Sequence, residues 1–166
     1  MRYFTRAWAN GELDDGAADL VWPEYLRDLQ ASFDPAGPVC GFATSVSLND
    51  AYVDRLTIRR SSNEVRLLLL TGSLQVGYWR TELVYSGGRI AQGEDVLRSA
   101  LELRPTEIWY DEFACDRDGG CHSFLLVPSG PLGEQEFQIA FDGFDYVQAP
   151  AGDRVLATPD NQSVWG

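Results

Sequence analysis

One short stretch of the chain gathers residue types that could act as nucleophile, base or metal ligand. Cys115 and Cys121 flank the run 116–120, and the single histidine, His122, follows directly. Two thiols and an imidazole suit zinc, but three groups leave its tetrahedron incomplete, and Cys40 is far away in the sequence. Adjacent strand residues such as Cys121 and His122 also point to opposite faces. Cys115 and Cys121 could be paired, free or metal-bound, and the pattern leaves these alternatives open.

A hydrolase built on His122 would need a thiol or hydroxyl beside the imidazole and an acid to orient it. The chain contains no GxSxG motif and no glycine-rich phosphate-binding motif of the GxGxxG or GxxxxGK type. All 13 basic residues are arginine, which excludes a lysine Schiff base and a P-loop lysine. We therefore expect no catalytic residues, no cofactor and no metal. A small hydrolase using His122 with a nearby cysteine is one alternative, and a metal-binding domain is another.

Acidic residues dominate the charge of the chain. The formal net charge is −12, and the segment 111–166 contains ten acids against two arginines. Such a charge repels nucleic acid and attracts cationic partners, although it could also serve solubility alone. We predict a binding domain that contacts a basic protein partner, as immunity proteins contact basic toxin domains. The candidate contact residues are Tyr110, Asp111, Glu112, Asp116, Asp118, Asp142 and Asp145.

Neither a secretory signal nor a membrane span is predicted. Apolar runs such as 67–70 are far too short to cross a bilayer, and no long apolar run follows Arg2 and Arg6. Three cysteines, an odd number, favour reduced thiols. These features predict a cytoplasmic protein that binds no membrane and no nucleic acid, and they leave its oligomeric state undetermined.

The N-terminal part of the chain is predicted to be helical. Phe4 and Trp8 lie four residues apart, which suits one face of a short helix over 3–9. An apolar stripe at helical spacing predicts a second helix, with Pro23 in its first turn and a stop at 34–38. The stripe consists of Trp22, Tyr25, Leu26, Leu29 and Phe33.

From residue 51 onward the hydrophobic period is mostly that of a strand. Alternating and β-branched runs predict strands separated by turns that contain serine, asparagine and glycine. These runs cover 52–60, 65–71, 76–85, 107–115, 121–127 and 136–141. A helix over 94–103, ended by Pro105, competes with an irregular segment there. The fold class is therefore α+β, with N-terminal helices packed on a largely antiparallel sheet of about six strands.

One domain accounts for all of these elements. A chain of 166 residues is long enough to bury a single core. We place the domain at 1–150, with a helical part at 1–38 and a β-rich part at 48–148. The remaining residues, 151–166, are predicted to form a polar tail.

Three short motifs occur in an order that is shared with a known group of proteins. They are 1–6 (Met-Arg-Tyr-Phe-Thr-Arg), 48–51 (Leu-Asn-Asp-Ala) and 109–113 (Trp-Tyr-Asp-Glu-Phe), the last followed by a glycine-containing turn and a histidine-bearing strand. In these features the chain resembles DUF4085, a bacterial family, over nearly its whole length. The resemblance implies a layout of helices and sheet and no established activity. Asn49 stands where that family usually has histidine, so a role requiring imidazole there is weakened.

Overall fold

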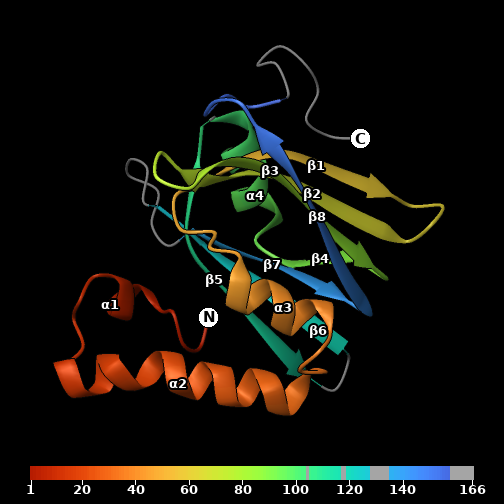
Figure 1. The fold of residues 1–166 in the computed structure, drawn as a ribbon. Helices are drawn as coiled ribbons and strands as arrows, with labels where there is room; N and C mark the ends of the chain where they lie inside the picture. Colours follow the sequence, from red (N-terminus) through yellow and green to blue (C-terminus); the bar gives the residue numbers. More distant parts are fainter. Residues whose placement is uncertain (104, 117–118, 128–134, 158–166) are drawn as a thin grey trace.

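The protein folds into a curved antiparallel sheet flanked by helices (Figure 1). The structure, a computed structural model, describes residues 1–103, 105–116, 119–127 and 135–157. The helices in this part are α1 (Arg6–Ala9), α2 (Asp15–Ser32), α3 (Pro38–Ser45) and α4 (Glu94–Glu102). The strands are β1 (Ala51–Arg59), β2 (Glu64–Ser73), β3 (Gly77–Ser86), β4 (Arg89–Gln92), β5 (Glu107–Asp116), β6 (Gly119–Leu126), β7 (Glu136–Phe141) and β8 (Gly143–Ala151).

The sheet bends back on itself. Its strand order is β4-β7-β6-β5-β1-β2-β3-β8, so β7 and β8 lie towards opposite edges although Asp142 alone separates them in the sequence. The main-chain N–H of Asp142 donates to the carbonyl of Ser86 at the end of β3, at 2.9 Å. Figure 1 shows β7 and β8 meeting at one corner of the molecule. This curvature brings side chains of β3, β5, β6 and β8 into one core.

The predicted α+β class and the antiparallel sheet are confirmed, whereas the predicted number of strands is wrong. Across the described residues the sheet has eight strands rather than about six. The added strand β4 has four residues, too few for a detectable alternation, and it pairs with β7. The other added strand is β8, which follows β7 after Asp142 alone. Most side chains of β8 are exposed, so apolar and polar residues do not alternate clearly along it. Its position in the sheet follows from its pairing with β3.

The helices also differ from their predicted bounds. Helix α1 is shorter than the helix predicted over 3–9. The main-chain N–H groups of residues 2–4 donate to Glu112 of β5 and do not form a helical turn. Pro23 lies inside α2 and not in its first turn, since this helix already begins at Asp15. Pro38 was assigned to the end of the preceding helix, but it is the first residue of α3. The N–H that proline lacks has no partner within the helix at this position, so proline is well tolerated there. Of the two alternatives left open for 94–103, a helix or an irregular segment, the structure has the helix, α4.

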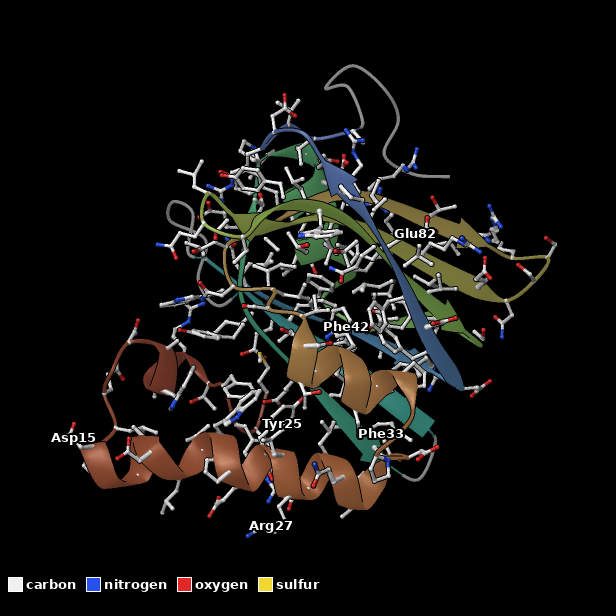
Figure 2. All side chains as sticks on the ribbon, in the orientation of Figure 1. Asp15, Tyr25, Arg27, Phe33, Phe42 and Glu82 are labelled. Carbon is white, nitrogen blue, oxygen red and sulfur yellow. The ribbon has the colours of Figure 1, made fainter. Side chains whose placement is uncertain are left out.

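An aromatic cluster fills the core between the sheet and α3. Phe42 of α3 points toward the sheet (Figure 2), and its ring centroid lies 5.9 Å from Phe113 and 5.5 Å from Phe144. Tyr85 joins from β3, with its ring 5.5 Å from Phe144. Phe42, Tyr85 and His122 are fully buried. The single histidine therefore belongs to the hydrophobic core.

The tail predicted at 151–166 packs against the sheet over its described part. Arg154 donates to the carbonyl of Asp50 at 2.9 Å and lies 4.0 Å over the ring of Tyr52. The N–H of Ala157 donates to Asp54 at 2.7 Å. Residues 158–166 lie outside the described residues. Within the described residues, none of the helices combines the length and the apolarity that a bilayer crossing requires.

Replacing Asp14 with alanine is expected to lower the free energy of unfolding by about 1 kcal/mol. The Asp14 carboxylate caps α2 by accepting the N–H of Ala17 at 3.0 Å, and the variant leaves that donor without its partner. Urea denaturation measures the change. Asp19→Ala, at an exposed position of the same helix, is the matched control and should change stability by less than about 0.5 kcal/mol. Equal losses in the two variants would contradict the capping role.

Candidate functional site

A pocket of about 350 Å³ opens beside β5, where the N-terminal segment, α2 and α3 come together. Residues 43–49, at the end of α3 and in the following loop, line it opposite a set of aromatic side chains. We call this cavity the aromatic pocket. Its aromatic wall consists of Phe4, Trp8, Trp22, Tyr25 and Tyr110. Asp111 also lines the pocket and is its one carboxylate among the described residues.

The aromatic wall is a continuous packed surface. Phe4 lies in its middle and is 4% exposed, with its ring centroid 5.1 Å from Trp8 and 5.0 Å from Tyr25. Trp8 in turn contacts Tyr110 edge to face at 4.7 Å. Rings at these distances and tilts attract one another through their quadrupoles, which fixes their orientation. The wall therefore exists before any ligand arrives.

A chain of hydrogen bonds runs from the core to Asp111. The hydroxyl of Tyr85 lies 2.8 Å from Nδ1 of His122, and Nε2 of His122 lies 2.9 Å from Oδ2 of Asp111. Burial lowers the pKa of His122 although Asp111 acts in the opposite direction, and burial raises the pKa of Tyr85 well above its ordinary value. A neutral imidazole then accepts from Tyr85 and donates its Nε2–H to Asp111. The imidazole thus holds the carboxylate in position at the pocket.

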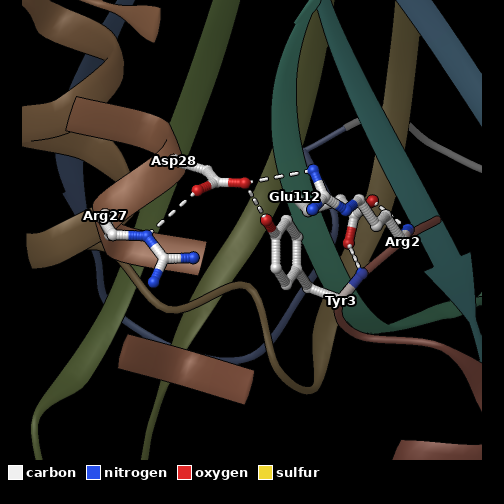
Figure 3. A network of polar contacts seen from close by, with 5 residues as sticks. All are labelled: Arg2, Tyr3, Arg27, Asp28 and Glu112. Carbon is white, nitrogen blue, oxygen red and sulfur yellow. Dashed lines mark hydrogen bonds and ion pairs between the residues drawn. The ribbon is translucent and has the colours of Figure 1, made fainter. Parts of the chain in front are cut away.

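Glu112, the next residue of β5, holds the N-terminal segment. Its side chain is buried, and its two oxygens accept the main-chain N–H groups of Arg2 and, at 2.8 Å, of Tyr3 (Figure 3). The main-chain N–H of Phe4 donates to it as well, at 3.1 Å. Asp28 of α2 adds a second tether, because it accepts from the Tyr3 hydroxyl and pairs with Arg2 at 3.1 Å. The bond from Tyr3 lowers the pKa of Asp28. These contacts fix the segment that carries the rings of Phe4 and Trp8.

The structure brings two of the seven predicted contact residues together in the pocket, Tyr110 and Asp111. Glu112 is 3% exposed and bonded to main-chain donors, which corrects its expected place on a contact surface. Asp142 and Asp145 are exposed near the corner of β7 and β8 and do not line the pocket. The two others are Asp116, which ends β5, and Asp118, which lies outside the described residues.

The thiol and metal hypotheses depend on how β5 and β6 pair. Cys115 is opposite Gly120, and Cys121 is opposite Ala114, so the two cysteines are not directly opposed across the strands. Sγ of Cys121 lies 3.8 Å from Oε1 of Gln138, whereas both ring nitrogens of His122 are bonded to Tyr85 and Asp111. Among the residues that the structure describes, no three His, Cys, Asp or Glu side chains are placed to hold a metal ion. The geometry favours neither alternative.

Sequence reasoning missed most of the pocket. The spacing of Phe4 and Trp8 and the stripe through Trp22 and Tyr25 were visible, but they were assigned to helix packing alone. Asn49 was noted only as a departure from histidine, and it also lines the pocket, where its side-chain amide donates to the carbonyl of Trp109 at 3.0 Å. No local signal connects these residues with β5. The connection depends on Glu112, whose partners are 108 to 110 residues away in the sequence.

Comparison with known proteins found no matching family model, no matching curated protein and no matching solved structure. The resemblance to DUF4085 proteins therefore stays a prediction. The pocket and the charge of the chain remain as the basis for assigning a function.

Proposed function

We propose that this chain is a binding domain that takes a cationic group of a basic protein partner into the aromatic pocket. The observation that carries the proposal is the position of the Asp111 carboxylate next to a wall of five aromatic side chains. The faces of tryptophan and tyrosine rings attract cations, and a carboxylate supplies a full opposite charge. The same pair of features would repel an anionic ligand.

The charge of the remaining surface supports the same partner. The chain carries a net charge of −12, and exposed acids such as Asp142 and Asp145 lie outside the pocket. Their field would steer a basic protein toward the domain and would be screened by salt. The pocket contact is short-ranged and partly desolvated, so it should depend less on salt. A basic partner is therefore attracted by the whole surface and oriented by Asp111.

Binding is better supported than hydrolysis by the surroundings of His122. A general base needs a ring nitrogen within reach of the nucleophile or its proton. Nδ1 of His122 is held by Tyr85 and Nε2 by Asp111, and the ring is fully buried. The imidazole stacks on Phe113, with ring centroids 3.7 Å apart. Such a histidine is suited to positioning a carboxylate.

The test uses an oligoarginine peptide as the basic probe, titrated calorimetrically into the protein. Asp111→Asn is expected to weaken binding about tenfold, since it removes the pocket charge while leaving an oxygen that can accept from His122. The control is Asp153→Asn, which removes the same charge at an exposed position that does not line the pocket. It should change affinity less than about twofold.

Two results would overturn the proposal. Equal weakening by both variants would mean that total charge, not the pocket, determines binding. Wild-type affinity that stays constant between about 0.05 and 0.5 M salt would contradict the electrostatic attraction of a basic partner.

A further inference from the structure

We infer that the cation accepted by the aromatic pocket is a fully alkylated ammonium group, of the trimethylammonium type. This inference rests on the proposed function, because it names the chemistry of the group that Asp111 and the aromatic wall would hold. Three observations support it. The polar side chains in 43–49, opposite the aromatic wall, are hydrogen-bonded within the protein, Asp111 already accepts a hydrogen bond from His122, and the aromatic wall itself suits an alkylated cation.

The polar side chains opposite the aromatic wall are bonded within the protein. The hydroxyl of Thr44 donates to the carbonyl of Cys40 at 2.7 Å, and that of Ser45 donates to the carbonyl of Gly41 at 2.5 Å. The amide of Asn49 donates to the carbonyl of Trp109 at 3.0 Å. These bonds use the hydroxyl hydrogens of Thr44 and Ser45 and one of the two amide hydrogens of Asn49. A phosphate or a carboxylate would lose these donors and would face the charge of Asp111, so an anionic ligand is disfavoured.

The Asp111 carboxylate is also partly occupied. Its Oδ2 accepts from Nε2 of His122 at 2.9 Å, and its side chain is 16% exposed. A guanidinium group binds a carboxylate best when its fork contacts both oxygens, so it still binds at Asp111 but loses part of this contact to His122. A primary ammonium has three N–H donors, each of which must find an acceptor when water is removed. An alkylated ammonium has no N–H, so it gains the attraction of the charge without this requirement.

The aromatic wall presents the complementary surface. Methyl groups on the nitrogen spread the positive charge over an apolar shell, which packs against ring faces as a hydrophobic group does. Trp22 is 45% exposed, and Trp8 and Tyr110 are half-buried at the pocket, so these rings are accessible to a ligand. A cavity of about 350 Å³ lies within the ordinary size range of small-ligand sites.

Two sources could supply this group: a free small molecule such as choline, or a trimethylated lysine side chain of the protein partner. The chemistry at the pocket is the same for both. Because the proposed function names a protein partner, the trimethyllysine source is the one expected. The arms of the test separate the two.

The first arm measures small probes by the fluorescence of the tryptophans and by calorimetry. Choline is compared with its uncharged carbon isostere, in which a tert-butyl group replaces trimethylammonium. Tetramethylammonium is compared with methylammonium and with guanidinium. The quaternary cations, choline and tetramethylammonium, are expected to bind at least about tenfold more tightly than the other probes. Asp111→Asn should remove this preference, and Trp22→Leu should weaken binding several-fold. Asp153→Asn, outside the pocket, should leave it unchanged.

The second arm compares one lysine-containing peptide in its unmodified and trimethylated forms and an arginine version. Tighter binding of the trimethylated peptide, lost in Asp111→Asn, supports both the ligand class and the protein partner. Equal or tighter binding of the lysine or arginine peptide, with the same dependence on Asp111, overturns the ligand class and leaves the proposed function standing. Binding of choline without binding of any peptide supports the ligand class and overturns the protein partner. Absence of saturable binding to every probe overturns both.

Discussion

Replacing Glu112 with alanine is expected to lower the free energy of unfolding by about 3 to 5 kcal/mol. The Glu112 carboxylate is 3% exposed and accepts main-chain N–H groups from Arg2, Tyr3 and Phe4. Alanine leaves these donors without an acceptor in a partly buried place, and it releases the segment that carries Phe4. Urea denaturation at neutral pH measures the loss.

A second variant and a control make this prediction specific. Glu112→Gln keeps one oxygen acceptor and presents an amide in place of the other, so its loss should be smaller than that of Glu112→Ala but still clear. Glu102→Ala changes an exposed residue of α4 and should stay within about 0.5 kcal/mol of the wild type. If Glu112→Ala were as stable as Glu102→Ala, the N-terminal segment would not depend on Glu112. Because that segment forms part of the aromatic wall, both Glu112 variants should also weaken cation binding.

Acid is expected to destabilise the protein through His122. Burial lowers the pKa of His122 below its ordinary value of 6.5, against the opposing effect of Asp111, whereas in the unfolded chain the imidazole titrates normally. Below pH 6.5 the unfolded state therefore binds a proton that the folded state does not. The free energy of unfolding should fall as the pH decreases below about 6.5, with a slope approaching 1.4 kcal/mol per pH unit. Above that pH the contribution of His122 to the slope should vanish.

The charged and titratable groups around His122 allow this slope to be assigned. Asp111 of β5 contacts Nε2, Tyr85 of β3 contacts Nδ1, and Glu112 adds a weaker electrostatic effect. Because the chain has a single histidine, His122→Gln should remove the slope between about pH 5 and 6.5. Tyr85→Phe is the matched control, since it removes a hydrogen bond to the imidazole and keeps the group that titrates. Unfolding free energies with the same slope in the wild type and in His122→Gln would contradict the buried neutral histidine.

Local patterns in the sequence predicted most of the secondary structure. Strands such as β2 and β5 were recognised because alternation and β-branched residues report burial of one face. Asp111 and Glu112 are adjacent on β5, and the structure gives them different partners: one bonds to His122 and the other to the N-terminal segment. For 94–103 the apolar spacing left a helix and an irregular segment as alternatives, and the structure has the helix.

The aromatic pocket could not be predicted in the same way, because it is created by contacts between distant segments. Phe4 meets Tyr110 because Glu112 binds main-chain N–H groups, and any sequence near the N-terminus offers such groups. The burial of His122 depends on the curvature of the sheet, which brings Tyr85 and Phe144 to the same core. Charge alone indicated a cationic partner but also selected Asp142 and Asp145, which lie outside the pocket.

A nuclear magnetic resonance titration of the labelled protein with tetramethylammonium tests the cation site at Asp111 most directly. We expect saturable shifts at the indole N–H groups of Trp8 and Trp22 and at the main-chain amides of Asn49 and Asp111. Signals of exposed residues outside the pocket, such as Asp153, should stay in place. Shifts that increase without saturation and spread over the exposed acids of the surface would show non-specific attraction and would contradict a cation site at Asp111.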